Sequence, residues 1–407
     1  MHAPTSSDRF EALRAAQQFA YDKAPAIRAV YEAAQMTPQD LRSAGDLARL
    51  AVTSKDMLLD KQRESPPFGG FLAVEETAIR RVFVSPGPIY EPQLFDDGTG
   101  HGFSHTFRHA GIGPGDRVLN TWSYHLVPAG LLLDEGIAAT GATLIPCGPG
   151  GAEQQAKLIV ELGITCICAS TAFFVTLVET LERMGYHLPS QWKVRSAMLG
   201  GELGDWMGKR RALEHKYAIQ TFSAYGTGDF GLIAYEELGK PGYTVQPDRL
   251  VQICEPQTGV PLGVGEPGQI VVTTLDRGWP LVRFGTGDVA QALAHSPDGL
   301  VDRIGPLQGR VGQGVKVREI FIYPRNVEEL VIQAPSVQRA QLVIGKQQHR
   351  ETACLRAVLA PDTNRDSAEA DLNERFKQLT RLKLDAIEWL SPEELAADAP
   401  LLVDNKH

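Results

Sequence analysis

The spacing of apolar and polar positions changes along the chain and predicts successive kinds of structure. In the first eighty residues, apolar side chains recur at helical intervals, and Thr37-Pro38 is a favourable helix start. The segments with this spacing, which predict helices, are residues 9–20, 24–35 and 37–52. A further short helix is predicted over residues 98–111, where Gly111 provides the stop signal.

From residue 116 onward, short apolar runs alternate with longer amphipathic segments. The runs that predict strands are residues 116–124, 142–148, 164–170 and 195–202, and the segments that predict helices are residues 129–141, 153–163 and 172–185. This alternation indicates β-α-β units, and therefore parallel sheets flanked by helices. From about Tyr243 the pattern changes to short β segments separated by turn residues, which predicts a β-rich subdomain.

A last block begins near Gly309 and mixes short strands with two amphipathic helices. It predicts a separate α+β domain of about a hundred residues. We therefore expect an α/β protein with a large N-terminal domain, residues 1–309, and a small C-terminal domain, residues 310–407. The length of 407 residues is sufficient for two or three domains.

The composition narrows the classes of protein to consider. A hydrophobic fraction of 43% and a charged fraction of 22% are typical of soluble globular proteins. No run approaches the ~20 apolar residues of a membrane span, and the N-terminus lacks the pattern of an export signal. The net charge of −9 argues against general affinity for nucleic acid or anionic lipid. We expect a cytoplasmic protein with a small-molecule partner, and neither a nucleic-acid nor a membrane partner.

Five cysteines are scattered along the chain, and an odd number without an export signal indicates reduced thiols. Cys166 and Cys168 lie on the same face of a predicted strand. They lack the spacing and the second ligand pair of a zinc site. Small buried hydrophobic residues are therefore the favoured interpretation of this pair.

Three segments carry candidate chemistry. Tyr225 and Asp229 lie in a glycine-rich segment after a strand-like run, where open α/β sheets bind ligands, although a pair of plain turns is the alternative. Asp288 follows a Gly-Thr-Gly turn and suits the paired hydroxyls of a ribose, with a surface turn aspartate as the alternative. Arg310 and Lys316 flank a glycine-containing stretch that suits a domain hinge with phosphate-directed cations.

Histidines give two weaker signals. His101, His105 and His109 recur at intervals of four, which places them on one face of a helix. This face either binds a metal or a phosphate or is simply exposed to solvent. His125, in the segment TWSYHLVP, either orients a polar group of a substrate or is a buried, hydrogen-bonded histidine.

In this order the segments resemble the phenylacetate-CoA ligase family of the adenylate-forming superfamily, over most of the chain. TSKDMLLDK and PPFGGFLAV resemble its early segments, and GDRVLNTWSYHLVPAG with GATLIPCGPGG resembles the apolar wall of its acyl pocket. GGELGDW resembles its adenine-side motif, and YGTGDFG its Tyr-Gly-x-Thr/Ser-Glu loop. RFGTGDV resembles its Arg-x-x-x-Gly-Asp motif, and GRVGQGVKVREIFIYP its hinge segment.

The resemblance implies the adenylate-forming fold, with a mobile C-terminal domain. It also implies joining of an acyl or aryl carboxylate to the α-phosphate of ATP and transfer of the acyl group to CoA. The implied cofactors are ATP/AMP, Mg²⁺ and CoA, and the implied assembly is a homodimer. The residues implied to bind the cofactors are Gly201, Glu202, Tyr225, Gly226, Asp288, Arg310 and Lys316. Those implied to bind the acid are Tyr124, His125, Gly130 and Gly200. Asp229 and Arg310 are implied to be catalytic, and Asp229 also to hold the metal.

The chain departs from the family pattern where the phosphates bind. The family's phosphate loop reads Ser-Ser-Gly-Thr-Thr-Gly-Lys-Pro, whereas residues 85–92 read SPGPIYEP, so that Glu91, which repels phosphate, stands in place of lysine. Gly228 stands in place of the Thr or Ser before the acid. Asp398 stands at the position of the C-terminal catalytic lysine, and Lys406 lies past that position.

The sequence therefore predicts an AMP-forming acyl- or aryl-CoA ligase with altered chemistry at the ATP site. The alternative is a catalytically divergent or inactive descendant that binds an adenosine-containing ligand, such as an acyl-CoA, an acyl-adenylate or AMP. A purely structural role is a third hypothesis, and fold kinship by itself does not choose among them.

Overall fold

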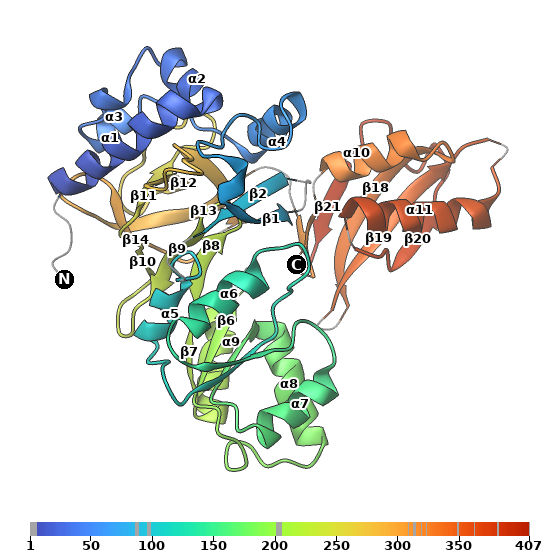
Figure 1. Cartoon of the computed structure of the whole chain (residues 1–407). Helices are drawn as coiled ribbons and strands as arrows, with labels where there is room; N and C mark the ends of the chain where they lie inside the picture. The colour runs from blue at the N-terminus through green and yellow to red at the C-terminus, as the bar shows by residue number, and fades with distance from the viewer. Residues whose placement is uncertain are drawn as a thin grey trace. The chain divides into compact units, whose positions relative to one another are not determined.

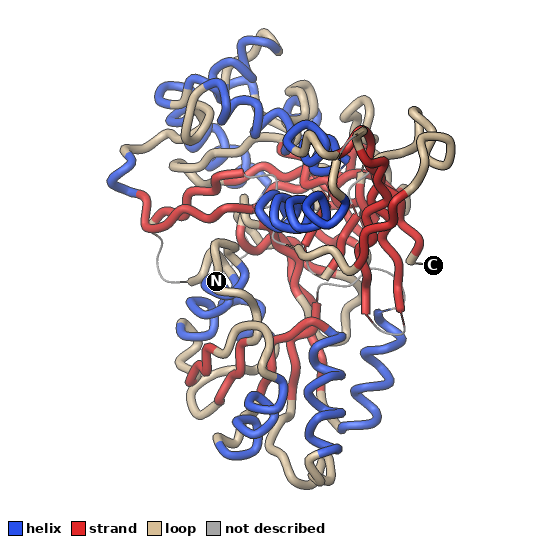
Figure 2. Tube along the Cα trace, turned by 90° about the vertical axis from the view of Figure 1, so that its right-hand side faces the viewer, coloured by secondary structure: helices blue, strands red, loops and turns tan. Residues whose placement is uncertain are grey.

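The computed structural model describes residues 6–85, 89–95, 99–200, 206–307, 309–311, 315–318, 320–322, 324–347, 350–361, 363–380 and 382–406. Contacts between Cα atoms divide the chain into two compact units, Met1–Gly309 and Arg310–His407 (Figure 1). Figure 2 distinguishes the strands, in red, from the helices, in blue. The predicted fold class is confirmed, because the structure contains a parallel sheet flanked by helices, antiparallel β structure, and a small α+β unit.

The N-terminal segment is helical, as expected. Its elements are α1 (Ser6–Lys23), α2 (Pro25–Ala33), the 3₁₀ turn η1 (Pro38–Asp40), α3 (Ala44–Leu47) and α4 (Lys55–Glu64). The single helix expected over residues 37–52 is wrong: it is split into η1 and α3. The backbone is already extended at Leu41, and Ser43, which is extended as well, caps a new start by accepting from the amide of Asp46.

The parallel sheet has the strand order β4-β3-β5-β6-β7. Its strands are β3 (Arg117–Asn120), β4 (Thr143–Pro146), β5 (Cys166–Ser170), β6 (Ser196–Gly200) and β7 (Gln220–Phe222). The helices of this region are α5 (Phe103–His109), α6 (Ala129–Ala138), α7 (Ala152–Glu161), α8 (Thr171–Arg183) and α9 (Trp206–Tyr217). Period-two alternation divides the strand side chains between two cores, and Cys166 and Cys168 are both buried in one of them, as expected.

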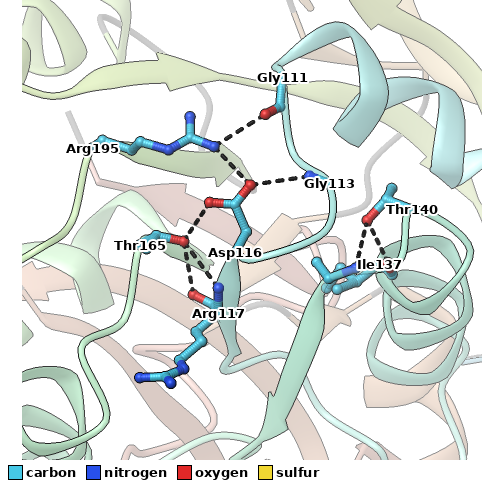
Figure 3. A network of polar contacts seen from close by, with 9 residues as sticks. Gly111, Gly113, Asp116, Arg117, Ile137, Thr140, Thr165 and Arg195 are labelled. Carbon is cyan, nitrogen blue, oxygen red and sulfur yellow. Dashed lines mark hydrogen bonds and ion pairs between the residues drawn. The ribbon is translucent and has the colours of Figure 1, made fainter.

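A polar network holds the amino-terminal ends of three parallel strands together (Figure 3). The carboxylate of Asp116 accepts from Nη2 of Arg195 at 2.7 Å, from the amide of Gly113 at 3.0 Å and from Oγ1 of Thr165 at 2.8 Å. Burial favours the neutral carboxyl, but these donors outweigh it and lower the pKa of Asp116. This edge of the sheet is therefore fixed by its own side chains, and ligand chemistry is expected at the opposite, carboxyl edge.

The β-rich subdomain is an antiparallel sheet with the strand order β11-β12-β13-β14-β10-β9-β8. Its strands are β8 (Ala224–Thr227), β9 (Gly231–Glu236), β10 (Tyr243–Val245), β11 (Arg249–Cys254), β12 (Pro267–Thr274), β13 (Phe284–His295) and β14 (Val301–Ile304). After the 3₁₀ turn η2 (Glu76–Ala78), strands β1 (Ile79–Ser85) and β2 (Ile89–Leu94) form a separate antiparallel hairpin. In the stretch that has the register of the phosphate loop, Ser85 ends β1, residues 89–92 lie in β2, and residues 86–88 lie outside the described residues.

The second unit is built on the four-stranded sheet β20-β19-β18-β21. After β15 (Gly309–Arg310), its elements are the hairpin of β16 (Val315–Val317) and β17 (Ile320–Ile322), then α10 (Pro324–Gln333), β18 (Val337–Gln347), β19 (Arg350–Leu359), α11 (Arg365–Thr380), β20 (Ala386–Trp389) and β21 (Leu402–Asn405). Strand β19 was not expected, because its hydrophobic positions are interspersed with charged residues. Within the described part of the chain, no helix combines the length and apolarity of a membrane span.

Candidate functional site

Tyr225 and Asp288 lie together in the β-rich subdomain. Tyr225 is in β8 and Asp288 is in β13, and the tyrosine hydroxyl donates to Oδ2 of Asp288 at 2.9 Å. Both residues are buried, so the interpretation of Asp288 as a surface turn aspartate is wrong. Residues 63 positions apart in sequence are therefore joined by a direct contact at the predicted adenosine end of the site.

Asp229 follows β8 and is paired with a lysine that the sequence did not single out. Its Oδ2 lies 2.8 Å from Nζ of Lys55, the first residue of α4. The side chain of Asp229 is fully buried, whereas that of Lys55 is 23% exposed. A partly exposed lysine side chain is thus joined to a buried carboxylate.

Glu91 is the second buried acid of this cluster. It lies in β2 opposite Phe83 and is only 1% exposed, and its Oε2 accepts from Oγ of Ser85 at 2.7 Å. Burial, and next the negative charge of Asp229, raise the pKa of Glu91 to about 8. Glu91 therefore holds a proton at neutral pH, which limits the buried negative charge beside Asp229.

The carboxyl of Glu91 occupies the space where a side chain at position 228 would begin. A Cβ added to Gly228 would lie 2.0 Å from Oε2 of Glu91 and 2.5 Å from its Cδ. The family's hydroxyl residue at this position is therefore sterically incompatible with Glu91 as it lies in this chain. Two departures that looked independent in the sequence, Glu91 and Gly228, are one packing arrangement.

The start of α4 is attached to the strand that carries Asp288. The amide of Thr53 donates to the carbonyl of Arg283, and the amide of Gly285 donates back to the carbonyl of Thr53, both at 2.9 Å. Ser54 then caps the helix by accepting from the amide of Met57 at 3.1 Å. These bonds fix the position of the backbone from which the side chain of Lys55 extends.

The same helix is also attached to the hairpin that carries Glu91. Gln62 donates through Nε2 to the carbonyl of Tyr90 at 2.7 Å and accepts at Oε1 from the amide of Tyr90 at 2.9 Å. Because Gln62 satisfies both backbone groups of one residue, β2 is held against α4 in a single register. Lys55 and Glu91 therefore reach Asp229 from elements that are locked together.

On the predicted acid side, Asn120 joins two of the residues that sequence reasoning chose. Its Nδ2 donates to the hydroxyl of Tyr124 at 2.9 Å and to the carbonyl of Gly130 at 3.0 Å. Burial, and then the charge of Asp134, raise the pKa of Tyr124, so its hydroxyl stays protonated. His125 is exposed, which rules out its interpretation as a buried histidine.

The remaining predicted residues of the first unit are glycines or lie outside the described residues. Gly200 ends β6, where an added Cβ would make an ordinary contact of 3.7 Å with Oγ of Ser223. At Gly226, in β8, a Cβ would lie 2.4 Å from the carbonyl oxygen of Gly231, so only glycine fits. Gly201 and Glu202 lie outside the described residues.

The predicted residues of the second unit lie near its beginning. Arg310 is in β15 and is half-buried, and Lys316 is in β16, where it is opposite Phe321. Near the other end of the unit, Nζ of Lys406 lies 3.4 Å from Oε1 of Glu351, whereas Asp398 is exposed in a turn. These contacts occupy Lys406 within its own unit.

A metal site has little support among the residues that the structure describes, where no three His, Cys, Asp or Glu side chains gather. His101 precedes α5 rather than extending it, and His109 packs against the ring of Tyr235 at 4.6 Å. Asp229, the implied Mg²⁺ ligand, faces the ammonium of Lys55 instead. These residues do not fit a magnesium site, so no step of the chemistry is derived through the metal.

Sequence reasoning missed Lys55 and Asn120. Lys55 did carry a signal, because the first helical position is next to the positive end of the helix dipole, where a cation is unfavourable. A lysine at such a position indicates an anionic partner elsewhere. Asn120 carried no comparable signal, because its two bonds depend on how the loop after β3 folds back.

Comparison with known proteins identifies relatives along most of the chain. No protein-family model matches. The phenylacetate-coenzyme A ligase of Aromatoleum evansii is 27% identical over 369 residues, which are 88% of this chain and 82% of that protein. The phenylacetate-coenzyme A ligase of Pseudomonas putida is 29% identical over 336 residues, which are 80% of this chain and 74% of that protein.

Solved structures share the fold. A 2-hydroxyisobutyryl-CoA ligase in complex with 2-HIB-AMP and CoA matches with a TM-score of 0.89 and 19% identity, over 98% of this chain and 89% of that one. The o-succinylbenzoate CoA synthetase of Bacillus subtilis matches with a TM-score of 0.58 and 16% identity, over 81% of this chain and 69% of that one.

Proposed function

Because the chain belongs to the phenylacetate-CoA ligase-like family of adenylate-forming proteins, we propose that it is an AMP-forming ligase that joins a small carboxylic acid to CoA. We further propose that its chemistry at the ATP site is altered. The acid enters as an acyl or aryl carboxylate. The adenylate forms at the α-phosphate of ATP with release of pyrophosphate, and the acyl group then passes to the thiol of CoA.

The contact between Tyr225 and Asp288 carries this proposal. It joins the aromatic ring of one motif to the carboxylate of another across two strands, at 2.9 Å. A buried carboxylate with one oxygen oriented by a hydroxyl suits the paired hydroxyls of a ribose, and the tyrosine ring beside it offers a face to a base. Gly226, next to this tyrosine, is exposed, and its close approach to Gly231 leaves no room for a side chain.

The acid is proposed to lie beside Tyr124 and Gly130. Asn120 fixes both through one amide group, so the tyrosine hydroxyl and the first turn of α6 keep a constant separation. Arg310 and Lys316, in the second unit, are proposed to supply cations for the phosphates of ATP or CoA. We also propose that the C-terminal unit is a mobile domain.

We also propose a cytoplasmic homodimer. All five cysteines are free, which suits a reducing compartment. The dimer rests on the commonness of twofold assemblies among soluble enzymes. Light scattering coupled to size exclusion tests the assembly directly, and a monomeric mass at micromolar concentration would contradict it.

The test of activity measures AMP and pyrophosphate in the presence of ATP, Mg²⁺, CoA and a panel of alkyl and aryl acids. A ligase yields AMP and pyrophosphate in equal amounts, together with one acyl-CoA, for at least one acid. Thermal stabilisation by AMP, CoA and ATP is measured in parallel, because a ligand that binds only the folded state raises the melting temperature. No product with any acid overturns the ligase proposal.

A second candidate is a non-ligase protein that binds an adenosine-containing ligand such as an acyl-CoA, an acyl-adenylate or AMP. The observation that favours it is Glu91, a buried acid in the register of the family's phosphate-binding lysine. Stabilisation by AMP or CoA but not by ATP, with no product, selects this candidate. If none of the three nucleotides shifts the melting temperature, both candidates are wrong.

A further inference from the structure

Two ionisable side chains reach Asp229 from two different elements. Position 91, on β2, carries an acid, where the family's pattern has a lysine. Lys55 of α4 brings its ammonium to 2.8 Å from Asp229, the acid of the Tyr-Gly-x-x-acid segment. The cation beside Asp229 is therefore supplied by α4 and not by β2.

Lys55 lies at a helical position that disfavours a cation. It is the first residue of α4, where the unpaired amide groups and the helix dipole are positive. Its charge is balanced by Asp229, which lies four residues after Tyr225 on the same segment. The pairing thus links the helix start to the residues proposed to hold adenosine.

Accessibility separates the ammonium from the two acids. The side chains of Asp229 and Glu91 are buried, whereas that of Lys55 is 23% exposed. Of these three side chains, that of Lys55 is the one with substantial exposure, so it is the one that an approaching anion can reach. A partly desolvated ammonium held by a buried carboxylate is a strong donor to phosphate oxygen.

The position of Lys55 is also fixed by its surroundings. Thr53 pairs with the start of β13, the strand of Asp288, and Gln62 holds the far end of α4 to β2. A long lysine side chain loses conformational freedom when it binds, and this anchoring of its base reduces that cost.

We propose that the ammonium of Lys55 binds the phosphate attached to adenosine, with Asp229 as the residue that orients it. The inference rests on the proposed function, since it assigns a phosphate contact to an adenosine site. It places a cation where the family resemblance implies a metal. The ordinary alternative is that Lys55 only neutralises a buried acid and never touches a ligand.

The experiment compares AMP with adenosine, which lacks the phosphate, as binding probes for the full chain. Lys55→Met removes the charge and keeps the aliphatic length, and Lys55→Arg restores the charge. Lys61→Met is the matched control, because Lys61 lies on the same helix, is 54% exposed and forms a surface ion pair with Glu64. Binding is measured by isothermal calorimetry, with melting temperatures as a check that each variant folds.

Lys55→Met is expected to weaken AMP binding about tenfold to a hundredfold and to leave adenosine binding unchanged. Lys55→Arg should recover part of the AMP affinity, and Lys61→Met should match the wild type. Equal loss of AMP and adenosine binding indicates a structural role and overturns the inference, as does unchanged AMP binding. If the wild type binds neither probe, the proposed function fails and the inference fails with it. A failure of the inference alone leaves wild-type binding intact.

Discussion

The two ends of the candidate site are built differently. At the proposed adenosine end, one hydrogen bond between Tyr225 and Asp288 joins two motifs whose residues keep the family's pattern. At the proposed phosphate end, Lys55 pairs with the buried Asp229, and Glu91 accepts from Ser85 and lies against Gly228. Both Glu91 and Gly228 depart from the family's pattern. The first end therefore depends on one hydrogen bond. At the second end, the residues at positions 91 and 228 fit each other only in their present combination.

This difference determines at which residues a single substitution measures the contribution of one contact. A residue that makes one contact can be changed alone, and its loss reports that contact. A residue inside a packed, charged cluster changes the fit and the charge of its neighbours together, so only paired substitutions separate the effects. Four predictions test this contrast, in order of decreasing effect.

The largest effect is expected at the phosphate end, from Gly228→Ala. The added Cβ would lie 2.0 Å from a carboxyl oxygen of Glu91, and such overpacking costs about 3 kcal/mol of unfolding free energy. Gly200→Ala is the matched control, because its Cβ makes an ordinary contact and the cost stays below about 1 kcal/mol. Chemical denaturation measures both.

The double variant Glu91→Ala with Gly228→Ala sharpens this prediction. Removing the carboxyl makes room for the Cβ, so the second substitution should cost much less than it does alone. Strictly additive costs would show that the two positions do not share one space.

At the adenosine end, Asp288→Ala should weaken adenosine binding by about 2 kcal/mol, the scale of a hydrogen bond to a charged group. Asp302→Ala is the control, because that carboxylate is 51% exposed and lies in the neighbouring strand β14. Calorimetric titration with adenosine measures the difference. Full affinity in the Asp288 variant would contradict the ribose assignment.

A smaller effect is expected from Tyr225→Phe. The ring remains, and only the bond to Asp288 is lost, at a cost of about 1 kcal/mol in unfolding free energy. Adenosine affinity should fall less than in the Asp288 variant. A larger loss in Tyr225→Phe would mean that the hydroxyl, rather than the carboxylate, dominates the adenosine end.

The last prediction concerns the pH dependence of stability. Burial and the charge of Asp229 raise the pKa of Glu91 from 4.5 to about 8, so the folded protein prefers the protonated form. Its contribution to stability is complete below about pH 4.5 and is lost as the pH rises through about 8. Glu91→Gln is neutral throughout and should flatten the decline between about pH 4.5 and about pH 8. Parallel slopes of melting temperature against pH would exclude this titration.

The sequence predicted the fold well because hydrophobic periodicity is a local property. The parallel strands and their helices follow from it, and only details that depend on capping or charge escaped, such as the break at Ser43 and strand β19. The candidate residues Tyr225 and Asp288 were found because motif spacing marks them. Their direct contact was not predictable, since it depends on the register of two strands.

The cluster around Asp229 was visible in the sequence only as a set of missing residues. Glu91 and Gly228 each departed from the family's pattern, but their common cause is a distance of 2.0 Å that sequence does not contain. Lys55 could have been suspected from its unfavourable helical position. The partner of Lys55 could not have been identified in this way, because Asp229 lies 174 positions further along the chain.

The close approach of Glu91 to Gly228 also bears on any redesign of the site. A Cβ at position 228 and the carboxyl of Glu91 as it lies in this structure would occupy the same space. A variant that carries the hydroxyl residue of the family's pattern at position 228 therefore requires a displaced carboxyl or a smaller residue at position 91. Restoring the family's pattern at this end of the site is a change of two positions together.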